Sequence, residues 1–326
     1  MSDEPRVWIL NLDAEHELEA VKSYAPTQHL RAIVARESRR LEGVLVAPGD
    51  IVLTEEDVVH RTALARAARG LRGAAWCPTP RALRLLSAAG ARVQDAPSLE
   101  VLRSVNARPF AAELREPLAR GSFSKHVATT LEETLSLIAR HAPDGWLVRR
   151  TFGAAGRGRR RIAAGIPTRD EQAWIAASLT LGPLVVEPWV QIVREYTRSG
   201  WVAPGGAITI SRPCFQETTA HGAWTRTECA TAGAVPHEDD EKLSEMMQSV
   251  GEALARAGYF GPFGIDAYRH RAPGGSRTTV LNPLSEINAR FTMDWATAFA
   301  FDPQLGVAHA RAAGLLNAAD AARRQS

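Results

Sequence analysis

Short apolar segments alternate with segments of helical periodicity along most of this 326-residue sequence. Residues 6–12 read as a buried first strand, and a helix is expected at about residues 30–40. Further short strands are expected at residues 44–46 and 51–53, and a helix at residues 82–89 stops at a glycine. This alternation predicts an α/β protein, and the 45% hydrophobic content is sufficient for a core in two or three lobes.

The composition argues against several classes of protein. No apolar run reaches the roughly 18 residues of a membrane span, and the amino terminus is acidic where a signal peptide is basic, so we expect a cytoplasmic protein without membrane contact. The cysteines Cys77, Cys214 and Cys229 are few, odd in number and without CxxC spacing, which indicates neither a disulfide framework nor a zinc site. The 39 basic residues nearly balance the 36 acidic ones, so a nucleic-acid partner is not indicated. Arginine fills almost every basic position.

A hairpin is expected near the carboxyl end. Residues 263–268 and 279–281 read as strands that flank a turn-like segment at residues 272–276. An antiparallel pairing there brings Asp266 toward Glu286, with Pro283 supplying the slack as a bulge.

Strand alternation then gathers polar groups on one face. In residues 285–290 the period of two places Glu286, Asn288 and Arg290 together. With Asp266 opposite, two carboxylates and an amide oxygen form a set of hard ligands that suits magnesium. For this pattern alone, a solvated polar strand end is the alternative interpretation.

Two other segments could contact a nucleotide. Residues 151–158 form a small-residue turn between strands, and the arginines around it favour an anion site over a simple loop. Residues 185–190 are an apolar strand that carries Glu187 into a turn, with Glu195 eight residues later. Such a strand can face an adenine edge and ribose hydroxyls, or it can be an ordinary strand exit.

Residues 11–16, which follow a strand end, could contact substrate or cap a helix.

In order and spacing these segments resemble the ATP-grasp superfamily. The match covers roughly residues 100–300, and its specific part is the Gly-Ile-Asp-Ala-Tyr and Glu-Ile-Asn-Ala-Arg pair. The resemblance implies an ATP-grasp fold, in which two α+β subdomains hold the nucleotide and an amino-terminal α/β lobe precedes them. The implied domains are residues 1–100, residues 101–187 with a glycine-rich lid, and residues 188–326 with the metal site.

The resemblance also implies roles for individual residues. Asp266, Glu286 and Asn288 would ligate magnesium. The resemblance implies two magnesium ions, and manganese could replace them. Arg149 and Arg108 stand where the family usually has lysines, which is a departure from its pattern. The residues that the resemblance implies at the ATP site are Arg108, Arg149, Gly153, Gly156, Arg157, Gly158, Glu187, Trp189, Val190 and Glu195.

The implied activity is that of a carboxylate–amine ligase. A small-molecule or peptide carboxylate would become an acylphosphate at the expense of ATP, and an amine would then displace phosphate. Arg290, and less directly Arg226 and Arg212, are the candidates for holding the acylphosphate. A homodimer is the commonest assembly for such a chain. Two alternatives stand beside the enzyme: an ATP-binding protein that has lost its chemistry, and a nucleic-acid- or phosphate-binding protein using the arginines of residues 157–161.

Overall fold

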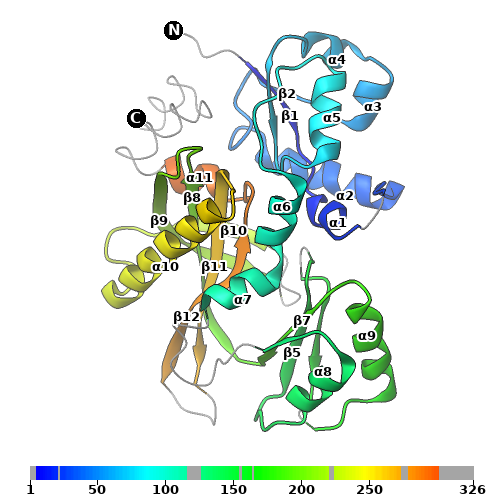
Figure 1. Ribbon diagram of the computed structural model, residues 1–326. Coiled ribbons are helices and arrows are strands. Elements are labelled where there is room, and N and C mark those ends of the chain that lie inside the picture. The colour runs from blue at the N-terminus through cyan, green and yellow to red at the C-terminus, as the bar shows by residue number, and fades with distance from the viewer. Residues whose placement is uncertain are drawn as a thin grey trace.

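The computed structural model describes residues 5–20, 23–115, 126–153, 156–163, 165–219, 224–272 and 278–300. Within these ranges the strands form three separate sheets of three, four and five strands. Figure 1 shows the amino-terminal sheet at the top, the four-stranded sheet at the lower right, and the five-stranded sheet between them and to the left. The mixed α/β class expected from the alternating pattern is confirmed.

The amino-terminal sheet is parallel, with the order β2-β1-β3. Its central strand is fully buried, as its apolar sequence predicts, and the cores on its two sides receive alternate side chains such as Val7 and Trp8. The strands of this sheet are β1 (Arg6–Ile9), β2 (Ile51–Val52) and β3 (Arg72–Ala75). The helices of this lobe are α1 (Ala14–Glu19), α2 (Gln28–Ser38), η1 (Arg39–Leu41), α3 (Glu55–Val59), α4 (Ala63–Ala67) and α5 (Pro80–Ala88).

Two expectations for this lobe and the segment after it were wrong. Residues 44–46 are not a strand, because the backbone N–H groups of Val44, Leu45 and Val46 all donate to the carbonyl of Leu41 and close a compact turn. Just after this lobe, the sequence of residues 98–115 predicts a single helix, but the chain forms two helices there, α6 (Leu99–Asn106) and α7 (Arg108–Arg115). Pro109 has no N–H group with which to continue the hydrogen-bond pattern of α6, so α6 ends before Pro109.

The four-stranded sheet has the order β4-β7-β5-β6 and is antiparallel throughout. The spacing of Thr130 and Glu133, and of Thr168 and Glu171, predicts a capping box at each position. Both helices of this sheet begin with these capping boxes. The elements of this small lobe are β4 (His126–Ala128), α8 (Leu131–Ile138), β5 (Trp146–Arg150), β6 (Arg159–Ile162), α9 (Arg169–Leu179) and β7 (Leu184–Pro188). The small lobe has its own hydrophobic core.

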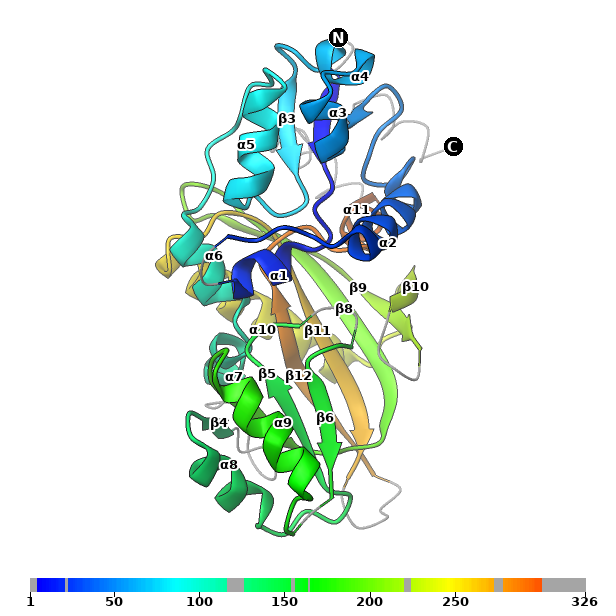
Figure 2. The ribbon, with the colours of Figure 1, turned by 90° about the vertical axis from the view of Figure 1, so that its right-hand side faces the viewer.

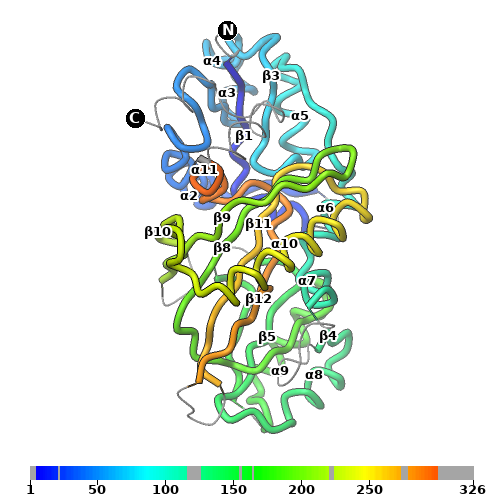
Figure 3. The backbone as a smooth tube through the Cα atoms, turned by 90° about the vertical axis from the view of Figure 1, so that its left-hand side faces the viewer, coloured from blue at the N-terminus to red at the C-terminus, as the bar shows by residue number. Residues whose placement is uncertain are grey.

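The five-stranded sheet has the order β10-β9-β8-β11-β12 and is also antiparallel. Its long strands run side by side from the amino-terminal lobe toward the small lobe (Figure 3). Its elements are β8 (Ile192–Val202), β9 (Ile208–Thr218), β10 (Trp224–Cys229), α10 (His237–Arg256), β11 (Gly261–Arg271), β12 (Thr279–Asn288) and α11 (Trp295–Ala300).

One hydrophobic core joins the amino-terminal lobe to the five-stranded sheet. It contains Trp8 of β1, Leu102 of α6, Met247 of α10, Phe263 of β11 and Trp295 of α11. The buried core of the small lobe is a separate cluster, and from the turn after β5 the partly buried Phe152 packs against the shared core. None of the helices in the described part of the chain is long and apolar enough to span a bilayer.

Candidate active site

The two acids expected to meet on the carboxyl-terminal hairpin do meet. Strands β11 and β12 pair with Asp266 directly opposite Glu286, and Asn288 Nδ2 donates to Asp266 Oδ2 at 3.2 Å. The register is irregular on the β12 side between Asn282 and Glu286, where the expected bulge residue Pro283 lies. Most of the turn expected at residues 272–276 lies outside the described residues.

The pair is electrostatically unfavourable without a cation. Burial raises the pKa of Asp266 to about 8, with a further contribution from the neighbouring charges of Glu286 and Asp294. Directly opposed like charges on neighbouring strands repel each other. In the described part of the chain no group of three His, Cys, Asp or Glu side chains is arranged to hold a metal ion. Two carboxylates with one amide oxygen nevertheless fit magnesium, because that ion keeps several waters and takes oxygen ligands from phosphate.

A buried acid at the end of β7 is held between two arginines. Glu187 is 4% exposed and forms ion pairs with Arg115 of α7 and with Arg149 of β5, the latter at 2.7 Å. Burial alone would raise the pKa of Glu187, but the charges of Arg149 and Arg115 outweigh it and hold that pKa below its usual value. Glu187 is therefore ionised at neutral pH.

Glu286 faces the same cluster of arginines. Arg108 Nη2 lies 3.1 Å from one of its carboxylate oxygens, and Arg149 Nη1 lies 3.9 Å from the other. We call Arg108, Arg115 and Arg149, together with Glu187 and Glu286, the arginine cluster. Its three guanidinium groups outnumber its two carboxylates, and the Nε atoms of all three arginines are buried without a hydrogen-bond partner among the described residues. A buried excess of positive charge with unused donors suits an anion such as a phosphate group.

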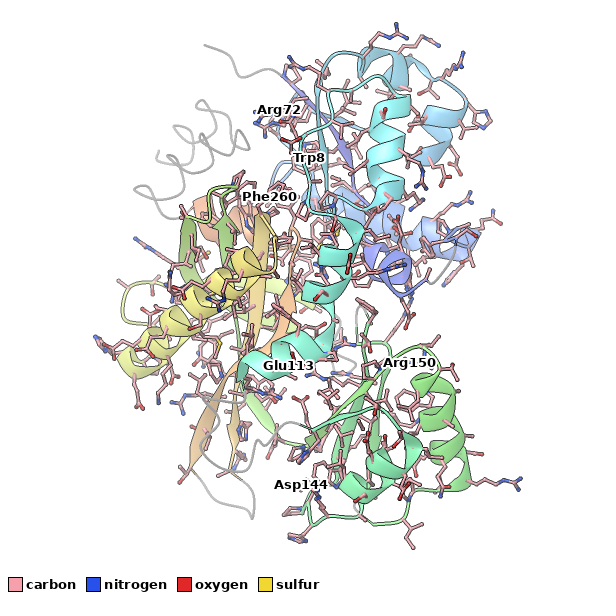
Figure 4. All side chains as sticks on the ribbon, viewed as in Figure 1. Trp8, Arg72, Glu113, Asp144, Arg150 and Phe260 are labelled. Atoms are coloured by element: carbon pink, nitrogen blue, oxygen red, sulfur yellow. The ribbon has the colours of Figure 1, made fainter. Side chains whose placement is uncertain are left out.

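The glycine-rich segment joins β5 to β6 at the end of the small lobe that faces the other lobes. Figure 4 labels Arg150 at this end of β5 and Asp144 at the opposite end of the lobe. Arg108 anchors the segment by donating to the carbonyls of Arg150 at 2.9 Å and Gly153 at 2.8 Å. A Cβ on Gly153 would lie 2.5 Å from the carbonyl oxygen of Arg157, so the turn tolerates no side chain there.

The carboxylate pair, the glycine-rich turn and the arginine cluster apart from Arg115 line one cavity of about 920 Å³. Its volume is at the upper end of the range of small-molecule sites, which is roughly 300–1,000 Å³. The cavity is bounded by the amino-terminal lobe, the small lobe and the five-stranded sheet. The residues expected from the sequence that line it are Arg108, Arg149, Gly153, Gly156, Arg157, Glu187, Trp189, Val190, Glu195, Asp266, Glu286, Asn288 and Arg290.

Three expected residues lie elsewhere. Arg212 on β9 is exposed and Arg226 on β10 forms an exposed ion pair with Glu228, and neither lines the cavity. These two are therefore withdrawn as candidates for holding an acylphosphate. Their strands are at the far side of the five-stranded sheet from β12, an order that the sequence does not reveal. Gly158, with φ +70°, shapes the glycine-rich turn without lining the cavity.

Arg290 is in the cavity wall, but its environment differs from the expectation. Strand β12 ends at Asn288, so Arg290 does not follow the strand alternation that was expected to aim it at the metal face. Its guanidinium forms an ion pair with Glu15 of α1 and lies 5.6 Å from the ring centroid of Trp76. Arg290 thus links the amino-terminal lobe to the five-stranded sheet.

The sequence reasoning missed several residues of the site. Arg115 pairs with Glu187 from 72 positions away, and no local pattern marks it. Asp294 lines the cavity after the end of β12 and accepts a hydrogen bond from Thr197 Oγ1 at 3.0 Å. Burial raises the pKa of Asp294. An acid eight positions after Glu286, in a chain segment already assigned to the site, was the one available signal for it.

Part of the arginine run on β6 is engaged in the small lobe. Arg160 lies 5.3 Å from the ring of Trp174, and Arg161 lies 4.7 Å from the ring of Trp189. Arg161 also donates to the carbonyl of Asp144 at 2.9 Å. These contacts give two of the arginines a role within the lobe, so a nucleic-acid surface is not proposed.

Comparison with known proteins supports the fold. No protein-family model matches the sequence, and no curated protein matches it significantly. Among solved structures, the biotin carboxylase–β,γ-ATP complex from Campylobacter jejuni matches with a TM-score of 0.53 and 11% identity, covering 94% of this chain and 73% of that one. D-alanyl-alanine synthetase A from Vibrio cholerae O1 biovar eltor str. N16961 matches with a TM-score of 0.51 and 13% identity, covering 89% of both chains.

N5-carboxyaminoimidazole synthetase from Staphylococcus aureus is similar to the same extent. Its TM-score is 0.51 at 11% identity, and the match covers 97% of this chain and 79% of that one. At such identities these matches establish the fold alone.

Proposed function

We propose that this chain, which matches ATP-grasp structures in its fold, is an ATP- and magnesium-dependent ligase that activates a carboxylate and joins it to an amine. The observation that carries this proposal is the cross-strand pair of Asp266 and Glu286, with Asn288 beside it. This pair shares one cavity with Arg108 and Arg149 of the arginine cluster and with the glycine-rich turn. Metal-binding carboxylates beside a positively charged wall are the arrangement that a nucleoside triphosphate requires.

Each wall would hold a different part of the nucleotide. Arg108 and Arg149 would bind phosphate oxygens, with the backbone of the glycine-rich turn close enough to approach them. Residues 187–190 would flank the adenine, and Glu195, which accepts a hydrogen bond from Thr218 at 2.6 Å, would face the ribose. The carboxylate of Glu187 is already held by two arginines, so its part is to orient Arg149.

Asp266, Glu286 and Asn288 would hold the metal. Magnesium, when bound, would neutralise charge on the phosphates and orient the terminal one for transfer. For these side chains, a cation would also relieve the repulsion between the two opposed carboxylates, which supports the assignment from the geometry of this chain.

The reaction proceeds in two steps. A substrate carboxylate oxygen attacks the terminal phosphorus of ATP, the bond to the bridging oxygen breaks, and ADP leaves with an acylphosphate remaining. An amine then attacks the acyl carbon, inorganic phosphate leaves, and the amine gives up its proton to solvent. The protein contributes position and charge, because no step requires a covalent bond to a side chain.

A second candidate is an ATP-binding protein without turnover. Arg108 and Arg149 both contact Glu286, so a proposed metal ligand is occupied by guanidinium groups in this state. If nucleotide cannot displace these contacts, ATP binds without being cleaved. Nucleotide binding that survives Glu286→Gln, with no turnover in the unmodified protein, would support this candidate.

The test is an ADP-release screen with mixtures of carboxylates and amines, followed by mass spectrometry of the product. We expect Asp266→Asn and Glu286→Gln each to abolish ADP release while the far-ultraviolet circular dichroism is unchanged. Glu228→Gln is the matched control, because Glu228 is an exposed acid on β10 outside the cavity, and it should retain full activity. Unchanged, magnesium-dependent rates in both site variants would exclude the metal assignment.

A further inference from the structure

Helix α2 turns an apolar stripe toward the cavity. Leu30, Ile33 and Val34 stand at positions i, i+3 and i+4, which share one face of a helix, and all three are half-buried and line the cavity. We call these three residues the α2 stripe. Figure 2 shows α1 and α2 at the lower edge of the amino-terminal lobe, next to the ends of the long strands.

The α2 stripe is not part of the protein's core. Within the described part of the chain, none of the hydrophobic clusters contains Leu30, Ile33 or Val34, either as a buried member or as a partly buried neighbour. An amphipathic helix normally buries such a stripe against another element. Here the space in front of it is the cavity itself.

The segment that follows α2 is held in place by other contacts. Leu41, just after the end of α2, is buried in the main core. Arg40 donates to the carbonyl of Thr225 at 2.7 Å and lies 4.1 Å from the ring centroid of Trp224 on β10. The carboxyl end of α2 is therefore anchored through η1, and the α2 stripe lines the cavity, where its apolar surface can meet a ligand.

Other residues that line the cavity give it the character of a ligand pocket. Trp224, Gln216 and Thr218 of β9 and β10 line the same cavity, so an apolar helix face and an aromatic ring are combined with a few polar groups. The ion pair of Glu15 with Arg290 also lines it. The cavity is continuous from the proposed metal ligands to the α2 stripe.

On the basis of the proposed function, we propose that the α2 stripe is the substrate-side-chain subsite, and that the ligase takes an amino acid or short peptide with a branched aliphatic or aromatic side chain. The subsite uses Leu30, Ile33 and Val34 to bury that side chain, while the reacting carboxylate or amine points toward the arginine cluster and the metal-binding wall. In a hydrophobic pocket of this kind, one methyl-sized group changes the kcat/KM of a substrate by roughly tenfold or more.

Paired substrates of equal shape test the subsite. ADP release is measured with leucine against asparagine and with valine against threonine, and we expect kcat/KM to be at least about tenfold higher for the apolar member of each pair. Leucinamide and 4-methylpentanoate then offer only the amine or only the carboxylate, which identifies the substrate that the subsite holds. Equal rates within each pair would overturn the subsite while leaving the ligase activity established.

Paired variants test the residues. Val34→Thr keeps the shape of the side chain, and Leu30→Asn nearly does, so both should raise KM for leucine about tenfold and leave the nucleotide Kd unchanged. The matched control is Leu64→Asn, because Leu64 is 50% exposed on α4 and outside the cavity. A purely structural stripe would instead show a lower Tm in the first two variants with an unchanged KM.

A separate binding measurement keeps the inference testable without turnover. Equilibrium dialysis of leucine against the full chain, in the presence of magnesium and ADP, should show binding that Val34→Thr weakens and Leu64→Asn does not. If ADP release is absent for every mixture, the ligase proposal fails but this binding result still decides the subsite. Failure to bind leucine or phenylalanine while ADP binds would overturn it.

Discussion

Replacing Asp266 by its neutral isostere should make the metal-free protein more stable at neutral pH while removing its activity. Asp266 is directly opposite Glu286, and burial together with that neighbour raises its pKa from about 3.8 to about 8. Asn288 Nδ2 can donate to an amide oxygen at position 266 as it does to the carboxylate. Asp266→Asn therefore removes a group whose ionised form the folded protein accommodates poorly, with little change in shape.

The sign and size of the effect follow from proton linkage. Between the two pKa values the folded state keeps a proton on Asp266 that the unfolded chain has released, so the folded state binds more protons. The free energy of unfolding then falls as pH rises, by at most about 1.4 kcal/mol per pH unit for one group. From pH 5 to pH 7 the unmodified protein should lose up to about 2.7 kcal/mol relative to Asp266→Asn, and the loss should level off above the folded-state pKa.

Urea denaturation at pH 5, 6, 7 and 8 with a metal chelator present measures this difference. Asp294, whose pKa burial also raises, is present in both proteins, so its contribution cancels. Glu228→Gln serves as the control, because that exposed acid should not change the pH dependence. Parallel curves for the unmodified protein and Asp266→Asn would show that Asp266 is already ionised at pH 5 and would refute the opposed pair as the source of the strain.

Three other predictions concern the surroundings of the site. Arg115→Met should lower the free energy of unfolding by about 3 kcal/mol in urea denaturation, because it leaves buried Glu187 with one arginine instead of two; a loss below about 1 kcal/mol would contradict the burial of that ion pair. Gly153→Ala should weaken nucleotide binding, because an added Cβ would lie 2.5 Å from a backbone oxygen of the turn. The Kd of a fluorescent ATP analogue measures this, and an unchanged Kd would show that the turn does not contact the nucleotide. Cys214 and Cys229 are paired across β9 and β10, and their sulfur atoms lie 3.0 Å apart. Diamide, which accepts one hydrogen from each thiol, should therefore form a disulfide between them. Peptide mapping that recovers both free thiols after diamide treatment would contradict this geometry.

The hairpin at the carboxyl end could be predicted because its signals are local. Alternation with a period of two and a turn-like segment define two strands, and antiparallel pairing then places Asp266 near Glu286 without knowledge of the rest of the fold. The capping boxes at Thr130 and Thr168 were equally local, and both helices begin where expected. In each case the deciding contact joins residues that are close in sequence or are connected by a single turn.

The partners of the arginines could not be predicted in this way. Arg115 reaches Glu187 across 72 positions, and Arg290 reaches Glu15 across 275. Which acid meets which arginine depends on how three sheets pack together, and local patterning carries no information about that packing. The cysteine pair was missed for the same reason, since spacing alone does not show that β9 and β10 are neighbours.

The arginines that stand where lysines are usual acquire a physical explanation from these contacts. Arg149 extends one Nη to Glu187 on β7 and the other toward Glu286 on β12, so a single side chain connects two sheets. A lysine ammonium is a compact point charge and lacks the planar fork that directs a separate Nη group to each of two carboxylates. The arginine cluster is therefore a preorganised link between the small lobe and the proposed metal-binding wall. Because its positive charge exceeds its negative charge, incoming phosphates can take the place of Glu286 at the guanidinium groups, and the released carboxylate is then free for the metal ion. The departure from lysine thus fits a working site in which nucleotide and metal bind together.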